Sequence, residues 1–210
     1  LGIAVPPCVG RALPRTTLAA ALARIPASFR ARLRWRDGAL FGFFRLWAPS
    51  YRTRLGQHRV TRRGLLSLAG MLRPRNRERV LGDPVLRPLP DLLLLDYLTY
   101  NNDRRWNLGT VRTGRRSLRL YPIDFGESFS CVPRRRSFSA ALFRRLGLFR
   151  GDVVRRLRAL DRDTLGRVLR HPVVGPLVER RHIDNVLRLR DRALRQIDSR
   201  RKRHGKGVVY

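Results

Sequence analysis

The chain of 210 residues is long enough for one domain, or a domain and a fragment, and to bury about 70% of its unfolded surface. Hydrophobic residues make up 43% of it and aromatic residues 8%, which excludes an intrinsically disordered chain. The net charge is +32, and every basic residue except Lys202 and Lys206 is an arginine. This charge predicts nonspecific attraction to phosphates, nucleic acid and anionic membrane surfaces.

The two cysteines and the apolar runs bear on metal sites, disulfides and membrane-spanning segments. Cys8 and Cys131 lie far apart and form no C-x-x-C pair, so the sequence predicts neither a zinc site nor a disulfide framework. The sequence leaves a single disulfide between Cys8 and Cys131 as an alternative. No apolar run approaches the roughly 18 residues of a membrane-spanning helix, and the first residues carry no clear signal peptide. We therefore expect no transmembrane segment.

The beginning of the chain predicts one short helix. Residues 1–16 hold several prolines and glycines and are expected to be irregular. Thr16 or Thr17 then caps a helix whose apolar residues recur at helical spacing, and Pro26 ends or kinks it.

The next stretch predicts a hairpin followed by a helix. Residues 33–36 and 39–47 are expected to be strands, because the Asp-Gly pair between them is a strong hairpin signal. Residues 48–59 are expected to be a loop. Thr61 then caps a helix that continues to about Leu72, and a basic connection with several prolines follows.

A buried helix and a second hairpin are predicted in the middle of the chain. An apolar block begins at Leu92, directly after Pro90 and Asp91, a pair that suits the start of a helix. Residues 91–100 are therefore expected to form a buried helix. Residues 108–111 and 118–123 are expected to be two strands joined by a turn.

Polar residues of catalytic type stand at the ends of these elements. Asp103 and Asn107 follow the predicted helix, and Asp124 and Gly126 follow the second strand. Kinases present a hydroxyl-orienting Asp, a metal-binding Asn and a metal-binding Asp in this order. Phosphoryl transfer needs hard oxygen ligands around magnesium and one carboxylate beside the attacking hydroxyl. The pattern therefore predicts Asp103 as the catalytic base, with Asn107 and Asp124 as ligands of a nucleotide-bound metal.

The same stretch resembles two short signatures of the atypical kinases, D-Y-L-x-x-N-x-D-R and a later D-x-G after an apolar residue. The group includes phosphatidylinositol 3-/4-kinase-like, HipA-like and four-jointed or secretory-pathway kinases. The D-Y-L-T segment resembles the four-jointed branch most. The resemblance implies an atypical kinase-like fold that uses ATP and Mg²⁺ or Mn²⁺. The matching residues are Asp96, Tyr97, Leu98, Thr99, Asn101, Asp103, Arg104, Ile123, Asp124 and Gly126.

Two departures from the kinase pattern keep other functions open. Asn107 follows Asp103 by four positions, whereas the general pattern has five; Asn102 has that spacing, but an amide cannot act as a base. No lysine precedes the motif to hold the nucleotide phosphates. A pseudokinase or inactive remnant that acts as a binding protein is therefore one alternative, and a basic nucleic-acid-binding module is another.

The last third of the chain predicts a helical bundle. Residues 127–137 lie where kinases keep an activation or substrate loop, and the arginines at 134–136 suit either an acidic substrate or a solvated basic loop. Amphipathic helices are then expected, and the chain should end in a flexible tail over residues 200–210. The expected helices span residues 139–148, 152–160, 164–170 and 177–199.

Together these patterns predict an α+β protein that is mainly helical with short β-hairpins. Residues 1–47 would hold the remnant of a nucleotide-binding lobe and a hinge hairpin, because the N-terminal lobe is incomplete or absent. Residues 48–199 would form a protein-kinase-like C-lobe. Its partners would be ATP and an unknown hydroxyl acceptor, which is a protein, a phosphoinositide or a small molecule. The four-jointed resemblance implies the secretory pathway or Golgi lumen; without it we expect the cytoplasm.

Overall fold

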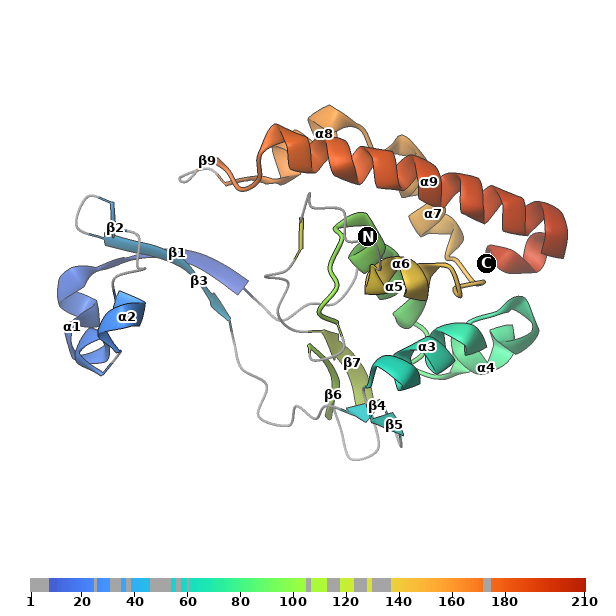
Figure 1. The fold of residues 1–210 in the computed structure, drawn as a ribbon, viewed down its shortest axis with the longest axis horizontal. Coiled ribbons are helices and arrows are strands. Elements are labelled where there is room, and N and C mark those ends of the chain that lie inside the picture. Colours follow the sequence, from blue (N-terminus) through green and yellow to red (C-terminus); the bar gives the residue numbers. More distant parts are fainter. Residues whose placement is uncertain are drawn as a thin grey trace. The chain divides into compact units, whose positions relative to one another are not determined.

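The structure is a computed structural model of the chain, and Figure 1 shows its fold. The chain divides into two compact units, residues 6–49 and residues 50–210 together with residues 1–5. The structure describes residues 8–24, 26–30, 35–36, 39–45, 54–55, 58–59, 61–104, 107–112, 118–122, 128–129, 137–171 and 175–210.

The smaller unit contains a three-stranded antiparallel sheet in the order β1-β3-β2. The predicted hairpin is confirmed, since β2 (Trp35–Arg36) pairs with β3 (Ala39–Arg45). The prediction that residues 1–16 are irregular is wrong for β1 (Cys8–Pro14). This strand pairs along β3, about 30 residues later, and Pro14 is tolerated because it ends a strand at the edge of the sheet. The unit also holds α1 (Arg15–Ala23) and α2 (Ala27–Arg30).

The larger unit is mainly helical, so the predicted α+β class with short hairpins is confirmed. Its helices are α3 (Arg62–Met71), α4 (Arg77–Gly82), α5 (Leu89–Leu98), α6 (Phe138–Phe143), α7 (Gly151–Ala159), α8 (Arg162–Val168) and α9 (Arg180–His204), with 3-10 turns η1 (Pro74–Asn76) and η2 (Lys206–Val208). Among the described residues of this unit, the strands form antiparallel pairs: β4 (Arg54–Leu55) with β5 (His58–Arg59), β6 (Leu108–Arg112) with β7 (Leu118–Pro122), and β8 (Arg170–His171) with β9 (Gly175–Pro176).

Helix α5 is the centre of the hydrophobic core. Its residues are buried except Leu95, as expected for a helix that is apolar on all sides. Pro90 stands in its first turn, where a missing N–H costs nothing. Tyr97 stacks on Phe143 of α6 with ring centroids 4.3 Å apart, and α5 also contacts α9. The core therefore holds the C-terminal end of α5 in place.

The elements around α5 agree with the sequence predictions to within a few residues. The predicted helix and the β6-β7 hairpin are both present, with Leu108 opposite Pro122. Thr61 caps α3 by accepting a 3.0 Å hydrogen bond from the Gly64 N–H. The expected loop over residues 48–59 instead contains β4 and β5, and the expected connection after Leu72 contains η1 and α4. These elements are too short to produce a periodic pattern.

The end of the chain contradicts the predicted flexible tail. Helix α9 continues to His204, and Gly205, with φ of 74°, reverses the chain. Val208 is fully buried, and its carbonyl accepts a 2.8 Å hydrogen bond from the Phe149 N–H. Tyr210 donates its N–H to the Phe149 carbonyl at 3.0 Å. One buried valine and this backbone pairing hold a segment whose composition resembles a disordered tail.

In the described part of the chain, no helix combines the length and the apolar character needed to cross a bilayer.

The N-terminal turn of α5 carries a buried carboxylate, Asp91. Arg150 donates a 3.0 Å hydrogen bond to it and also pairs with the more exposed Asp152 at 2.7 Å. Burial raises the pKa of Asp91 to about 6, although Arg150 lowers it. Its first-turn position is favourable for a negative charge, because the helix dipole is positive at that end.

Asp91 predicts a pH dependence of stability. Its pKa rises from 3.8 to about 6 on folding, so the folded protein binds this proton more tightly than the unfolded chain. The resulting stabilisation is present below pH 4 and is lost as the pH rises through about 6. We expect the wild type to gain unfolding free energy relative to Asp91→Asn as the pH falls from 6 to 4. Urea unfolding followed by circular dichroism measures both.

Asp152→Asn is the control, because hydrogen bonding to Arg150 lowers the pKa of Asp152. Its contribution is present above the unfolded pKa and is lost as the pH falls. As the pH falls from 6 to 4, the unfolding free energy of the wild type should therefore rise relative to Asp91→Asn and fall relative to Asp152→Asn. A shift in the same direction would contradict the assignment of Asp91.

Candidate active site

The candidate site begins where α5 ends. The Asn101 N–H donates to the Asp96 carbonyl at 2.8 Å, and the Tyr100 N–H donates to the Tyr97 carbonyl at 3.2 Å. With Tyr100 at a φ of 58°, these bonds form a Schellman motif. A left-handed tyrosine is strained by about 1 kcal/mol or more, so tertiary contacts must hold it there. The motif turns residues 101–104 sharply away from the helix axis.

A fully buried ion pair fixes this loop to α5. Arg104 donates from Nε to Asp96 Oδ2 at 2.8 Å and from Nη2 to Asp96 Oδ1 at 2.7 Å, and both side chains are 0% exposed. Asn101 adds a third hydrogen bond to the carboxylate, at 3.1 Å. Burial raises the pKa of Asp96, while the hydrogen bonds and charge of Arg104 lower it. The paired geometry keeps residues 96 to 104 as one rigid unit.

Asp103 and Asn107, which the sequence singles out, lie together on this unit. The Asn107 Nδ2 donates to Asp103 Oδ2 at 2.9 Å. The backbone on both sides is held, because the Asp103 N–H donates to Asn101 Oδ1 at 3.1 Å and Arg104 Nη1 donates to the Asn107 carbonyl at 2.8 Å. Both side chains are partly exposed. Among described residues, Asp103 Oδ1 and Asn107 Oδ1 accept no hydrogen bond, so these two oxygens are available to a ligand.

Asn102 connects the same loop to the start of α6. Its Oδ1 accepts hydrogen bonds from Ser137 Oγ at 2.9 Å and from the Ser139 N–H at 3.2 Å, and its Nδ2 donates to the Tyr100 carbonyl at 3.0 Å. Ser137 is also the N-cap of α6. On the other side, the Phe129 N–H donates to the Thr99 carbonyl. Phe129 and Ser137 are therefore both hydrogen-bonded to residues at the end of α5.

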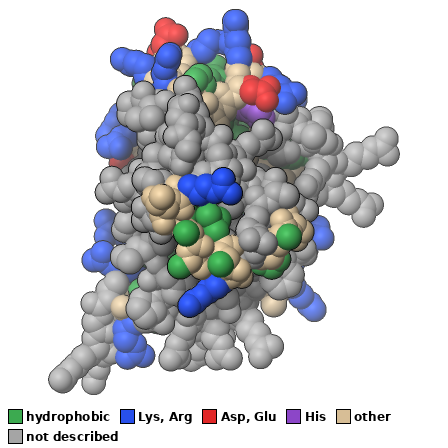
Figure 2. Space-filling view, turned by 90° about the vertical axis from the view of Figure 1, so that its left-hand side faces the viewer, with side chains coloured by type: hydrophobic (Ala, Val, Ile, Leu, Met, Phe, Trp, Pro, Cys, Tyr) green, Lys and Arg blue, Asp and Glu red, His purple; other side chains and the backbone are tan. Residues whose placement is uncertain are grey.

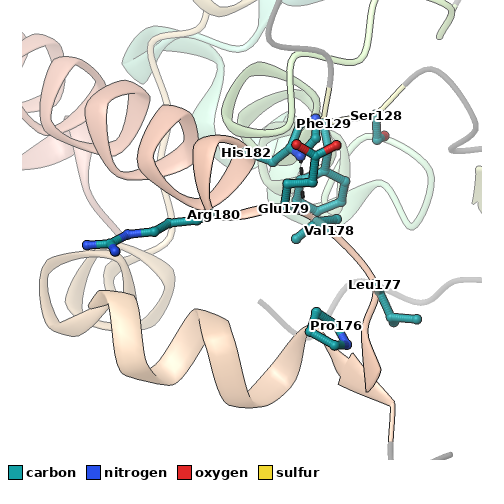
Figure 3. A pocket seen from close by; sticks show the side chains of 8 residues that line it. All are labelled: Ser128, Phe129, Pro176, Leu177, Val178, Glu179, Arg180 and His182. Atoms are coloured by element: carbon teal, nitrogen blue, oxygen red, sulfur yellow. Dashed lines mark hydrogen bonds between the residues drawn. The ribbon is translucent and has the colours of Figure 1, made fainter. Parts of the chain in front are cut away.

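An open cavity of about 750 Å³ lies beside this region. Figure 3 shows that it lies between Phe129 and the start of α9, where Glu179 and His182 form a capping box. The Glu179 N–H donates to His182 Nδ1 at 3.1 Å. Arg180 extends away from the other labelled side chains. The cavity is large enough for a small ligand or a peptide side chain, and its wall includes apolar and charged groups.

The third predicted site residue, Asp124, lies outside the described residues, two positions after the end of β7. Among described residues, no group of three His, Cys, Asp or Glu side chains is placed to hold a metal ion. Sequence reasoning did not identify the structural role of Asp96 or of Asn102. A carboxylate inside an otherwise apolar helix was the available signal for Asp96, because such a group must find a partner.

A scan against protein-family models and a search of curated proteins both found no match for this chain. The atypical kinase resemblance stays a prediction.

Arg104 predicts a large stability effect. Arg104→Met removes the cation and leaves the Asp96 carboxylate buried without its main partner. Breaking a buried pair in this way costs about 3–5 kcal/mol, so we expect a loss of that size in unfolding free energy at pH 7, measured by urea unfolding. Arg158→Met is the control, since it breaks a pair whose side chains are 49% and 41% exposed. It should cost less than about 1 kcal/mol, and equal losses would contradict the prediction.

Asn102 predicts a local effect at the start of α6. Asn102→Ala removes the acceptor of the Ser139 N–H, so hydrogen exchange at that amide should accelerate. Two serines lose a shared acceptor, and the expected cost in stability is about 1–3 kcal/mol. Mass spectrometry of peptides that contain Ser139 measures the exchange. Asn76→Ala is the control, because it removes a bond to the Met71 carbonyl and should leave the Ser139 amide protected.

Proposed function

We propose that this chain is a phosphotransferase of the atypical kinase type, whose larger unit is a kinase-like C-lobe and which uses ATP and a divalent cation. The hydrogen bond between Asp103 and Asn107 is the observation that carries the proposal. It joins the two side chains that the kinase pattern assigns to the base and to a metal ligand, and the neighbouring Arg104 is held by a buried ion pair.

Asp103 has the properties that the base of such a reaction needs. Its Oδ2 is held by Asn107, and its Oδ1 accepts no hydrogen bond among described residues. In the proposed step, the oxygen of an acceptor hydroxyl bonds to the γ-phosphorus of ATP. The bond from that phosphorus to the bridging oxygen breaks, ADP leaves, and the hydroxyl proton passes to Asp103. A carboxylate fixed on a rigid loop orients the hydroxyl before the bond forms.

The donor set fits Mg²⁺ or Mn²⁺. The amide oxygen of Asn107 is available, and Asp124 would supply a carboxylate oxygen close in sequence to β7. Both are hard ligands of the kind that magnesium prefers. When bound, the cation would neutralise charge on the nucleotide phosphates. The chain's own contribution would be to supply one oxygen from the loop after α5 and one from a residue two positions past the end of β7 in sequence.

The acceptor is a hydroxyl of a protein, a phosphoinositide or a small molecule. The cavity beside Phe129 favours a site for it on the α9 side of the loop, because residues 128–129 follow Asp124 by four and five positions. The smaller unit, with its β1-β3-β2 sheet, would be the remnant of the nucleotide-binding lobe.

One sequence feature favours a second candidate, a pseudokinase that binds nucleotide without turnover. Lysines occur only at Lys202 and Lys206, so none precedes the motif to hold phosphates. The experiment below separates the two candidates.

Binding and turnover should respond to different substitutions. We expect Mg²⁺-dependent binding of ATP in a calorimetric titration, and its loss in Asp124→Ala, because that residue holds the cation. Asp103→Asn should still bind ATP but should lower turnover about 10²–10⁴-fold, the usual contribution of a general base. Hydrolysis of ATP, with water as acceptor, measures turnover before the natural acceptor is known.

Asp163→Asn is the control, since Asp163 is exposed in the first turn of α8 and has no proposed role. The titration should use salt high enough to suppress nonspecific phosphate binding. Binding without hydrolysis in the wild type would favour the pseudokinase. No metal-dependent binding in the wild type would contradict both candidates.

A further inference from the structure

Helix α9 carries a row of arginines on one side. Arg188, Arg192, Arg195 and Arg203 recur at spacings of four, three and eight, which places them on one face of an α-helix. All four are exposed. At about 1.5 Å per residue, they span roughly 22 Å. We call these four residues the basic row.

The acidic residues of α9 do not neutralise this row. Asp184 and Asp191 precede Arg188 and Arg195 by four positions, the spacing at which helix residues usually form ion pairs. The structure instead pairs Asp184 with Arg162 of α8 and Asp191 with its neighbour Arg190. The third aspartate, Asp198, pairs with Arg158 of α7. With about 100° per residue, the three aspartates form a separate row about a quarter turn away.

The basic row has no carboxylate partner among the described residues. Arg188 donates to the neutral side chain of Asn185, and Arg203 donates to Ser199 Oγ at 3.2 Å. Arg192 and Arg195 make no hydrogen bond or ion pair with the rest of the described chain. The row therefore keeps its full positive charge.

Further arginines stand beside the row. Burial raises the pKa of Tyr97, while the charges of Arg192, Arg188 and Arg195 and of Arg144 at the end of α6 lower it, so Arg144 acts on the same hydroxyl as three residues of the row. Nearer the end of α9, Arg200 donates to the Arg144 carbonyl. Four cations held this close repel one another, and an anion placed between them would relieve that repulsion.

The chemistry of the surface favours a nucleic acid over a lipid bilayer. A helix that binds a membrane surface presents large apolar residues beside its basic ones. Among described residues, the large hydrophobic side chains that are exposed are Val168 and Leu177, and neither lies in α9. A straight line of guanidinium groups without an apolar wedge matches the regular phosphates of a nucleic acid backbone.

Arginines also lie elsewhere on the described surface, so the basic row is distinguished by the positions of its charges and not by charge alone. Figure 2 shows one face of the molecule, where arginine and lysine side chains emerge at several separate places and acidic side chains gather mainly near the top. On such a surface the charges are spread. The basic row differs because consecutive helical turns place its charges in line.

We infer that the basic row of α9, with Arg144 beside it, is a binding face for the phosphate backbone of nucleic acid. The face is independent of the proposed phosphotransferase. It recognises phosphates without reading sequence, since nothing in the row is arranged to contact base edges.

The salt dependence of binding tests this inference. The full chain is titrated with a fluorescein-labelled duplex DNA of about two helical turns, and log K is plotted against log salt. The triple variant Arg188→Gln, Arg192→Gln, Arg195→Gln should reduce the slope by about 2 to 3, because each lost phosphate contact removes about 0.9. Glutamine forms helices well and the positions are exposed, so α9 should persist. Circular dichroism checks that it does.

Two matched variants complete the experiment. Arg155→Gln, Arg156→Gln, Arg167→Gln removes the same charge from exposed positions on α7 and α8 and should change the slope by less than about 1. The triple variant Arg188→Lys, Arg192→Lys, Arg195→Lys should keep the wild-type slope. Equal losses in the two glutamine triples would overturn the inference in favour of diffuse attraction. It would also be overturned if the first triple lost binding to phosphatidylserine vesicles and kept the duplex slope.

Discussion

The buried pair between Asp96 and Arg104 is the interaction on which the candidate site depends. Removing two charges from water costs about as much as their attraction returns, so such a pair contributes little to net stability. Its value is geometric. The two hydrogen bonds of the guanidinium allow one relative placement of α5 and the following loop, and the same guanidinium also holds the Asn107 carbonyl. Asp103 and Asn107 meet because Arg104 is fixed.

The sequence predicted the elements whose signals are local. The apolar block gave α5, because a segment that is apolar on all sides must be buried. Thr61 gave the start of α3, since one hydroxyl satisfies an N–H three residues later. The strand β1 was missed because its partner β3 is distant in sequence, and the docked tail was missed because one valine, Val208, decides it. Long-range pairing leaves no period to detect.

The candidate site shows the same division between local and distant signals. The order of Asp103 and Asn107 could be read from the sequence, whereas the hydrogen bond between them is seen only in the fold, and their catalytic roles stay a prediction. The role of Asn102 could not be read, because its partners, Ser137 and Ser139, are 35 and 37 positions away. An asparagine at the end of a helix is typical of any turn. Only the fold shows that this one connects two segments.

The hydrogen-bond partners of Asp103 are unusual for a carboxylate in an arginine-rich chain. Other carboxylates, including Asp91, Asp96 and Asp152, are paired with arginine. A guanidinium bound to both oxygens of Asp103 would occupy the lone pairs that a hydroxyl needs. Asp103 is instead held by two asparagines, one at its backbone N–H and one at Oδ2. Neutral partners fix the position of the carboxylate without neutralising it, which is what the proposed role of Asp103 as a general base would require.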